Sequence, residues 1–594
     1  RIGRHDNFFE LGGNSLLAIT MIERLKDRLW HASPRSIFLH PVLADLAACV
    51  EPMQSRMKVP PNRIGIDCDR ITPDLLPLVT LDQSDIDRIA ATVPGGERNI
   101  QDIYPLAPLQ EGILFHHLIT SETDPYLDRA LIGFGSRAEL ERFLAAFQVV
   151  VNRHDVLRTA ILWEGLPTPV QIVWRNAAVP VEEVALADDD PAAALWRQFE
   201  HARIDIRQAP LIQVTIAEDP VKHRWLLLLL NHHLTSDHIT LEHILAEIRS
   251  LLAGEISGLA EPIPFRNFVA EVRLNVDHTK QEEFFREMLG DVEEPTVPLG
   301  LSDVHGDGSA IAEARSHLDP ALSERLRRAV RRHGVTAASL FHLAWALVLA
   351  RLSGREDIVF GTVLFGRFHG GIGADRAFGL FINTLPLRIV VKDRSVVQAL
   401  QETQDRLGQL LGYEHASLAM AQSCSALPPN TPLFTTLLNY RYTPVPIETN
   451  FHSAGAQLLR SEERSNYPLA LAIDETDKGF DLTVQINGSM EPAGIVRFVQ
   501  TAVDSIVTAL ETAPDTQMYH VGVLMPEERQ QILSDLAPGE MAVSPQPFSA
   551  LFETQASLSP AATALVFAHG QMSYGELNRR SNRLAHRLIR EGIG

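Results

Sequence analysis

Residues 225–230 (WLLLLL) form an apolar run, and residues 231–238 (NHHLTSDH) follow it directly. A short apolar run of this kind is typical of a buried β-strand. Leu241, Ile244, Leu245 and Ile248 then recur at the spacing of one helix face. The polar octet is therefore expected at a strand-to-helix connection, where catalytic side chains are often held.

His232, His233 and Asp237 are the candidate catalytic residues of this connection. An imidazole can take or relay a proton near pH 7, and a nearby carboxylate can fix the local geometry. Zinc binding is the alternative interpretation. It is disfavoured because the histidines are adjacent rather than four residues apart on a helix, and because no cysteine accompanies them. We therefore expect no metal.

The same alternation of strand and helix patterns extends from about residue 99 to residue 540 and predicts a mixed α/β fold. This stretch exceeds the roughly 250–300 residues at which single cores stop growing. We therefore expect two lobes with a cleft between them, an N-lobe of about 99–275 and a C-lobe of about 276–540.

Residues 1–52 are expected to form a small helical unit, because Leu17, Met21, Leu25 and Leu29 recur every fourth position behind the turn at 12–15 (GGNS). Ser15 stands at the start of that helix, where the ordinary role of a serine is to cap it. Repeated prolines in residues 53–98 predict a linker. Residues 541–594 are too few for a complete domain, and both ends of the chain are expected to be cut from something longer.

Composition narrows the classes of function. The net charge is −21, so nucleic acid is not an expected partner. Three scattered cysteines fit neither a disulfide framework nor a thiolate metal site. No apolar run approaches the ~20 residues of a membrane span and no signal segment opens the chain, so we expect no membrane association and a cytoplasmic location.

Residues 6–17 (DNFFELGGNSLL) closely resemble the modification motif of the peptidyl carrier domains of nonribosomal peptide synthetases. The resemblance implies that Ser15 carries phosphopantetheine, attached by a phosphopantetheinyl transferase, and holds substrate as a thioester. It further implies that residues 1–52 are a partial carrier domain.

Residues 231–238 resemble the His-His-x-x-x-Asp-Gly core of condensation domains, which belong to the chloramphenicol acetyltransferase-like superfamily. Three further signatures occur in the family's order: 104–112 (YPLAPLQEG), 153–159 (RHDVLRT) and 378–384 (FGLFINT). The resemblance implies two lobes in a V around a tunnel, which a donor carrier and an acceptor carrier enter from opposite sides.

By this resemblance His233 lies mid-tunnel and hydrogen-bonds the acceptor amine, either positioning it or taking its proton. Asp237 is expected to be structural, paired with a buried arginine that the sequence does not identify. His238 replaces the family's usual glycine, which puts a bulky ring where the backbone normally has most freedom.

Residues 114–124 (LFHHLITSETD) resemble the additional signature of dual condensation/epimerisation domains, with Thr123 in place of the expected glycine. Inverting an α-carbon requires proton removal from one face and return to the other, which gives additional imidazoles a purpose. His116 and His117 are both candidates, since spacing does not decide which faces the tunnel. The alternative is that both are solvated at a helix edge.

Residues 551–578 resemble the beginning of an adenylation domain, without its phosphate-binding loop. The expected function is nonribosomal peptide synthesis: epimerisation of the L residue that ends the upstream carrier-bound donor, then amide formation with a downstream carrier-bound aminoacyl group. The alternatives are a condensation-only domain taking a D or an L donor, a non-catalytic carrier-docking domain, and an acyltransferase using free coenzyme A.

Overall fold

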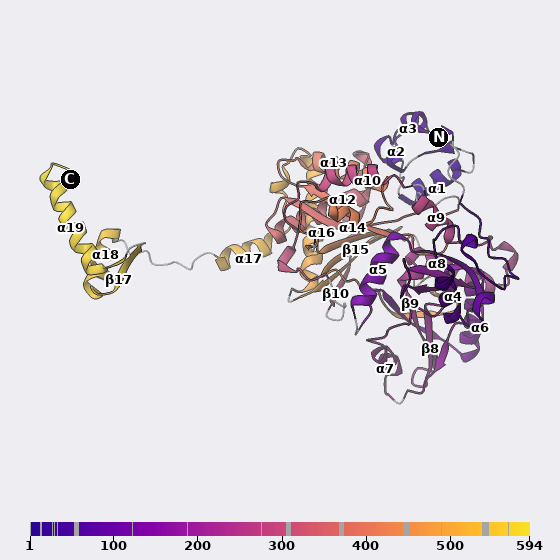
Figure 1. Ribbon diagram of the computed structural model, residues 1–594. Helices are drawn as coiled ribbons and strands as arrows, with labels where there is room; N and C mark the ends of the chain where they lie inside the picture. The colour runs from indigo at the N-terminus through magenta and orange to yellow at the C-terminus, as the bar shows by residue number, and fades with distance from the viewer. Residues whose placement is uncertain are drawn as a thin grey trace. The chain divides into compact units, whose positions relative to one another are not determined.

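Figure 1 shows the computed structural model of the chain. It describes residues 2–593 except residues 12, 14, 27, 29, 33, 53–58, 121–122, 187, 275, 305–310, 368–372, 430, 444–448, 450, 453, 489, 537–545 and 568–569. The chain divides into two compact units, Arg1–Met525 and Pro526–Gly594, which are described one after the other.

The N-lobe of the first unit is a mixed α/β layer structure. One sheet has the strand order β3-β6-β5, and a second has the order β14-β4-β9-β8-β7. The bounds are α4 (Gln83–Thr92), β3 (Ile100–Pro105), α5 (Pro108–Ile119), β4 (Leu127–Phe134), α6 (Arg137–Arg153), β5 (Thr159–Leu162), β6 (Val170–Trp174), β7 (Val181–Glu183), α7 (Pro191–Gln198), β8 (Ile212–Asp219), β9 (Arg224–His232), α8 (His238–Leu252) and α9 (Arg266–Leu274).

The C-lobe is built on a six-stranded sheet of order β10-β16-β15-β13-β11-β12. Its central helix, α12, is apolar on nearly every face and almost wholly buried. The bounds are α10 (His278–Leu289), β10 (Ile311–His317), α11 (Pro320–Arg332), α12 (Ala337–Ser353), β11 (Asp357–Leu364), β12 (Asn383–Val390), α13 (Val396–Leu411), α14 (Leu418–Ser423), β13 (Thr436–Tyr442), β15 (Leu469–Thr476), β16 (Gly479–Asn487) and α16 (Pro492–Thr512).

Two segments from the C-terminal half pack into the N-lobe. β14 (Gln457–Glu462) pairs antiparallel with β4 and so extends the N-lobe sheet. Residues 374–381, which we call the crossing segment, contribute Phe378 and Phe381 to the N-lobe core. The expected division at about residue 275 therefore describes the bulk of each lobe but not these two segments, because β-pairing joins strands far apart in the chain.

Residues 59–98, expected to be a linker, are packed onto the N-lobe. Ile64, Ile71 and Leu76 are buried against strand residues of the β3-β6-β5 sheet. α4 follows with a capping box, in which Asp82 accepts from the backbone N–H of Asp85. The prolines in this stretch interrupt helical periodicity without preventing burial of the apolar residues between them.

The N-terminal helical unit comprises α1 (Ser15–Lys26), α2 (Pro34–Leu39) and α3 (Leu43–Cys49), with β1 (Trp30–His31) paired to β2 (Glu51–Pro52). Gly12, Asn14 and Leu29 of the predicted pattern lie outside the described residues. Phe9 and Phe38 of this unit belong to the same buried cluster as the C-lobe core. α2 lies against α13, where a Cβ atom at Gly408 would approach Phe38 Cβ to 2.7 Å (Figure 1).

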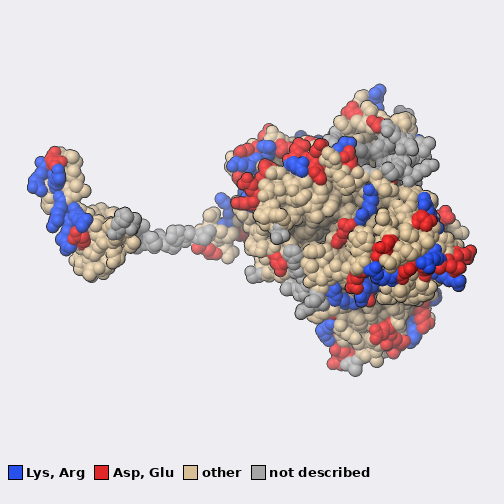
Figure 2. Space-filling view, in the orientation of Figure 1, with Lys and Arg blue, Asp and Glu red and all other residues tan. Residues whose placement is uncertain are grey.

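The second unit contains α17 (Pro526–Leu536), α18 (Phe548–Leu558), the hairpin of β17 (Thr563–Phe567) and β18 (Gly570–Ser573), and α19 (Tyr574–Arg590). Figure 2 shows a row of basic side chains along α19. Several of them form ion pairs within the helix, such as Arg579 and Arg580 with Glu576. These contacts are typical of a solvated helix face.

Among the described helices, α16 is the one that is long and apolar enough by itself to span a membrane. The helices α11 and α12 are so only when they are taken together, and they are bent by 109° relative to each other. More than half of the apolar stretch of α16 is buried, and the helix packs on α12 and on β16 of the C-lobe sheet. Both features are those of a core helix.

We expect Phe381→Ala to destabilise the first unit by about 3–5 kcal/mol, the usual cost of truncating a buried phenylalanine. The Phe381 ring is 1% exposed and packs on Phe268 with ring centroids 4.5 Å apart. Chemical unfolding followed by circular dichroism measures the loss. Phe548→Ala is the control, because that ring is 83% exposed; an equal shift in both variants would contradict the role given to the crossing segment.

Candidate active site

The histidine turn (residues 231–238) is held between β9 and α8, as the apolar run and the helical spacing predict. β4 pairs antiparallel with β9 over its whole length. His232 ends β9, and His233 opens a 3₁₀ turn and donates its backbone N–H to the Tyr126 carbonyl oxygen at 2.9 Å. Backbone hydrogen bonds of β9 and α8 thus fix the turn at both of its ends.

Asp237 forms a buried ion pair with Arg367. The two carboxylate oxygens lie 2.9 and 3.0 Å from Arg367 Nη2, and both side chains are fully buried. Asp237 also caps α8 by accepting from the Thr240 backbone N–H, and it accepts the Phe381 N–H of the crossing segment. Arg367 is therefore the buried arginine that the sequence left unidentified.

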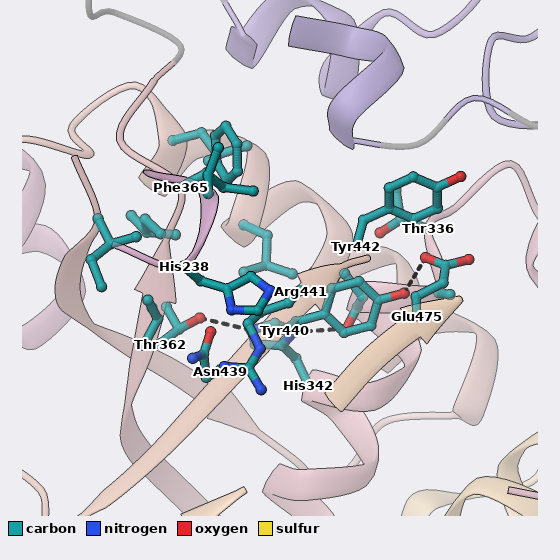
Figure 3. Close-up of a pocket in the computed structure, with 18 of the residues that line it drawn as sticks. His238, Thr336, His342, Thr362, Phe365, Asn439, Tyr440, Arg441, Tyr442 and Glu475 are labelled. Carbon is teal, nitrogen blue, oxygen red and sulfur yellow. Dashed lines mark hydrogen bonds between the residues drawn. The ribbon is translucent and has the colours of Figure 1, made fainter. Parts of the chain in front are cut away.

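His238 stands at the first position of α8, and its Nε2 lies 3.5 Å from Glu242 Oε1 one turn later. The residue is not among those with positive φ. The ring that replaces the expected glycine is accommodated because this position has helical geometry and its side chain borders the cavity drawn in Figure 3.

The His233 ring is buried, at 9% exposure, and both of its nitrogens face acceptors. Nδ1 lies 3.2 Å from the Ser236 carbonyl oxygen, and Nε2 lies 3.1 Å from Asp128 Oδ1. Burial by itself would lower the pKa of His233, but the negative charges of Asp128 and Glu463 outweigh it and raise the pKa to about 9.

Two cavities meet at His233. The first, of about 640 Å³, is drawn in Figure 3 and is bordered by His233 together with Phe9, Gly13 and Phe38 of the N-terminal helical unit. The second, of about 1290 Å³, is bordered by His233 and by residues of β4, α5 and the C-lobe sheet. His233 therefore borders two spaces with different linings.

His116 and His117 have different surroundings. His116 lines the second cavity, 5.8 Å from the Tyr126 ring, and its Nε2 lies 3.4 Å from Asn466 Nδ2. His117 is buried and lies 2.5 Å from Asp124 through its Nδ1. Of the two imidazoles that spacing did not separate, His116 is the one that borders the cavity.

His117, Asp124 and His232 form one buried network. Asp124 Oδ2 lies 2.5 Å from His117 Nδ1 and 3.0 Å from His232 Nε2. Burial would raise the pKa of Asp124, but these two hydrogen bonds outweigh it and lower that pKa. His232 Nδ1 accepts the Leu234 N–H, so its proton is on Nε2. The three groups are close enough to share a cation, but we interpret them as a hydrogen-bonded network that anchors the histidine turn.

Tyr126, Asp128 and Arg367 are site residues that the sequence motifs did not single out. Asp128 had a recognisable signal, because it and Arg129 are the charged residues of a strand pattern that is apolar elsewhere (127–134, LDRALIGF). Arg367 had no such signal in the sequence, because it lies 130 residues from its partner Asp237. Ser15 is the first residue of α1, and Gly13, two residues before it, borders the first cavity.

Comparison with known families gives two matches. The condensation domain family matches residues 100–533, and the phosphopantetheine attachment site matches residues 1–50. The second match assigns covalent phosphopantetheine to the N-terminal helical unit. Ser15 is the first residue of α1 there, and a side chain at Gly13 has no room because its Cβ atom would lie 2.4 Å from the Phe8 ring.

Malpinin synthetase of Mortierella alpina is 45% identical over 599 residues, which cover 100% of this chain and 8% of that protein. Malpibaldin synthetase of the same organism is 44% identical over 598 residues and covers 100% of this chain and 11% of its own. One of the linear gramicidin synthase proteins of Brevibacillus parabrevis is 30% identical over 88% of this chain and 10% of its own. The chain thus spans about a tenth of the length of these relatives.

Two solved structures show the same fold. A four-domain nonribosomal peptide synthetase bound to AMP and glycine superposes with a TM-score of 0.63 at 15% identity, over 83% of this chain and 39% of that one. The condensation domain of the monacolin K polyketide synthase superposes with a TM-score of 0.56 at 20% identity, over 71% of this chain and 100% of that one. The mixed α/β fold predicted from the sequence is confirmed.

We expect Arg367→Met to destabilise the first unit by about 3–5 kcal/mol, because it leaves the Asp237 carboxylate buried without its partner. Arg376→Met is the matched control, since that side chain is 59% exposed and lies 3.9 Å from Asp375. Thermal unfolding compares the two variants. Equal melting temperatures would show that the ion pair does not hold the histidine turn to the crossing segment.

Proposed function

This chain belongs to the condensation domain family, and on that premise we propose that it forms amide bonds in nonribosomal peptide synthesis. The substrates are an acyl donor on the N-terminal carrier and an aminoacyl acceptor on a downstream carrier. Phosphopantetheine on Ser15 supplies the thiol that holds the donor as a thioester. A phosphopantetheinyl transferase is the further partner that this proposal requires.

One observation carries the proposal: His233 lies where two cavities meet, and the first is bordered by Gly13, two residues before Ser15. A donor reaching from that side and an acceptor in the second cavity would meet at the same imidazole. When two reactants are held close together in the right orientation, their reaction becomes effectively intramolecular. This positioning can lower the activation barrier by up to about 7–11 kcal/mol.

The chain's own groups have separable tasks in this reaction. Asp237 and Arg367 fix the histidine turn, and the Asp124 network orients His232 beneath it. His233 presents Nε2 toward the second cavity because its Nδ1–H is donated to the Ser236 carbonyl oxygen. The burial of the ring strengthens its electrostatic interaction with charge that develops in the transition state.

We expect His233→Ala to reduce amide formation by about 100-fold or more, the scale of losing a positioned proton-transfer group. The assay is single-turnover coupling between separately loaded donor and acceptor carriers, analysed by mass spectrometry. His452→Ala is the matched control, because that side chain is exposed. Full coupling by a folded His233→Ala protein would refute the role of His233. Absence of coupling in the wild type would favour a docking function instead.

The finer proposal is that the same site also epimerises the L residue at the end of the donor. It is supported by the signature at 114–124. Since His116 borders the second cavity, this proposal requires the terminal residue of the donor to pass His233 into that cavity before the acceptor binds. The Tyr126 ring lies 5.8 Å from the His116 ring and 6.5 Å from the His233 ring. Two imidazoles flanking one aromatic ring offer separate routes for removing and returning an α-proton.

We expect the wild-type chain, loaded with an L-aminoacyl thioester in heavy water, to release acid that carries α-deuterium and includes the D enantiomer. His116→Ala should lower deuterium incorporation by about 100-fold while coupling of a D donor persists. Chiral chromatography with mass spectrometry measures both. Absence of α-deuterium in the wild type would leave a condensation-only domain.

The remaining alternatives differ in what they require. A carrier-docking domain needs no intact histidine turn, whereas His232, His233 and Asp237 are all present and ordered here. An acyltransferase using free coenzyme A needs no fused carrier, whereas residues 1–50 match an attachment site. We further propose that the second unit is the start of an adenylation domain, on the resemblance of residues 551–578.

A further inference from the structure

Asp128 is a carboxylate in the reaction space that neither the sequence motifs nor the expected mechanism uses. It lies on β4 directly opposite Asn231 of β9, so both side chains leave the sheet on the same face. That face borders the second cavity together with His233. Asp128 is 30% exposed there, which leaves its carboxylate accessible from the cavity.

Two oxygen atoms at this point have unused capacity to accept hydrogen bonds. Among the residues that the structure describes, neither Asp128 Oδ1 nor Asn231 Oδ1 receives a well-directed hydrogen bond, although both atoms are buried. Asp128 Oδ1 is 3.1 Å from His233 Nε2, and Asn231 uses its amide nitrogen to donate to Ser236 Oγ. Because the Asp128 side chain is 30% exposed and borders the cavity, its carboxylate suits a cationic donor such as an ammonium group, and Asn231 Oδ1 is a neighbouring acceptor with spare capacity.

The surroundings of His233 favour its doubly protonated form. The Ser236 carbonyl oxygen can only accept, so Nδ1 bears a proton. A carboxylate oxygen 3.1 Å from Nε2 would repel a lone pair there, so Nε2 bears a proton as well. An imidazole in this state has no lone pair with which to take a proton from an amine.

The other charges near His233 are already paired. Glu463 and Arg441 lie 2.7 Å apart, and Arg441 is also 2.7 Å from Asp474. His238 faces Glu242 on α8, and His232 faces Asp124 on the opposite side of the turn. Among the residues that the structure describes, the ion pair of Asp128 is with His233 alone.

Resting on the proposed amide-forming function, we propose that Asp128 binds the α-ammonium group of the acceptor and takes its proton, and that His233 enters the reaction as the imidazolium ion. Asn231 Oδ1 accepts a second ammonium N–H. The acceptor therefore occupies the second cavity, and the base of the reaction is Asp128.

Every proton in these steps has a donor and an acceptor. The ammonium gives one proton to the Asp128 carboxylate, and the freed lone pair attacks the donor carbonyl carbon to form the C–N bond. The C–S bond then breaks, and the leaving thiolate takes the proton from His233 Nε2. The nitrogen, now part of the amide, returns its surplus proton to His233, and Asp128 releases its proton to solvent. The products are the amide, the thiol and one proton.

Asp128→Asn tests the proposal through the pH dependence of single-turnover coupling. In the wild type the coupling rate should stay constant up to about pH 9 and fall at higher pH. The reason is that the pKa of His233 is raised to about 9 and the protonated form is the active one. Losing the Asp128 charge lowers that pKa, so the fall should move down by about one pH unit or more. We also expect about 100-fold slower coupling and a higher KM for the acceptor.

A second measurement does not depend on turnover. Carbon-13 labelling of the histidine rings in the full chain follows the titration of His233 by NMR, with the signal assigned from a His233→Gln sample. The pKa should be about 9 in the wild type and lower in Asp128→Asn. Asp128→Glu, which keeps the charge, should restore it in part. Asp481→Asn is the control, because its carboxylate pairs with His317 on the edge of the C-lobe sheet.

Three results would overturn the proposal. One is a wild-type rate that rises up to about pH 9 with Asp128→Asn faster at neutral pH, which would make neutral His233 the base. The second is an unchanged pH profile in Asp128→Asn. The third is an unchanged His233 titration. Failure of the amide-forming function is distinguishable, because the wild type would then couple no substrate while the titration still reports on Asp128.

Discussion

The buried ion pair between Asp237 and Arg367 is the contact on which the site depends. It joins the end of the histidine turn to the crossing segment, where Arg367 also donates to the carbonyl oxygens of Ala374 and Ala377. Burying two charges is costly, and the cost is recovered only when both groups are fully hydrogen-bonded, as they are here. The pair therefore fixes geometry: it holds His233 in position between the two lobes.

The two pairs of adjacent histidines, 116–117 and 232–233, are arranged in the same way. In each pair, one imidazole is anchored and its neighbour borders a cavity. His117 and His232 are anchored on the same carboxylate, Asp124, whereas His116 and His233 line the second cavity. Adjacent residues of a strand or helix point in different directions, so anchoring one imidazole of a pair orients the backbone that presents the other.

The electrostatic character of the second cavity suits an amine substrate. Asp128 and Glu463 place negative charge near His233, and Arg441 pairs with both Glu463 and Asp474. The charges of Asp128 and Glu463 raise the pKa of the imidazole to about 9, which favours the protonated ring. In the reaction that we propose, the protonated ring stabilises charge and another group receives the amine's proton.

The sequence alone determined the local pieces: the apolar run became β9, the spaced leucines and isoleucines became α8, and the motifs identified the family and Ser15. Those signals are local because strand and helix periodicities repeat within a few residues. Only the tertiary structure decided that Arg367 meets Asp237, that β14 joins the N-lobe sheet, that residues 59–98 are packed, and that His116 rather than His117 reaches the cavity. Each of these depends on contacts between segments far apart in the chain, where burial and charge pairing, rather than local spacing, select the partner.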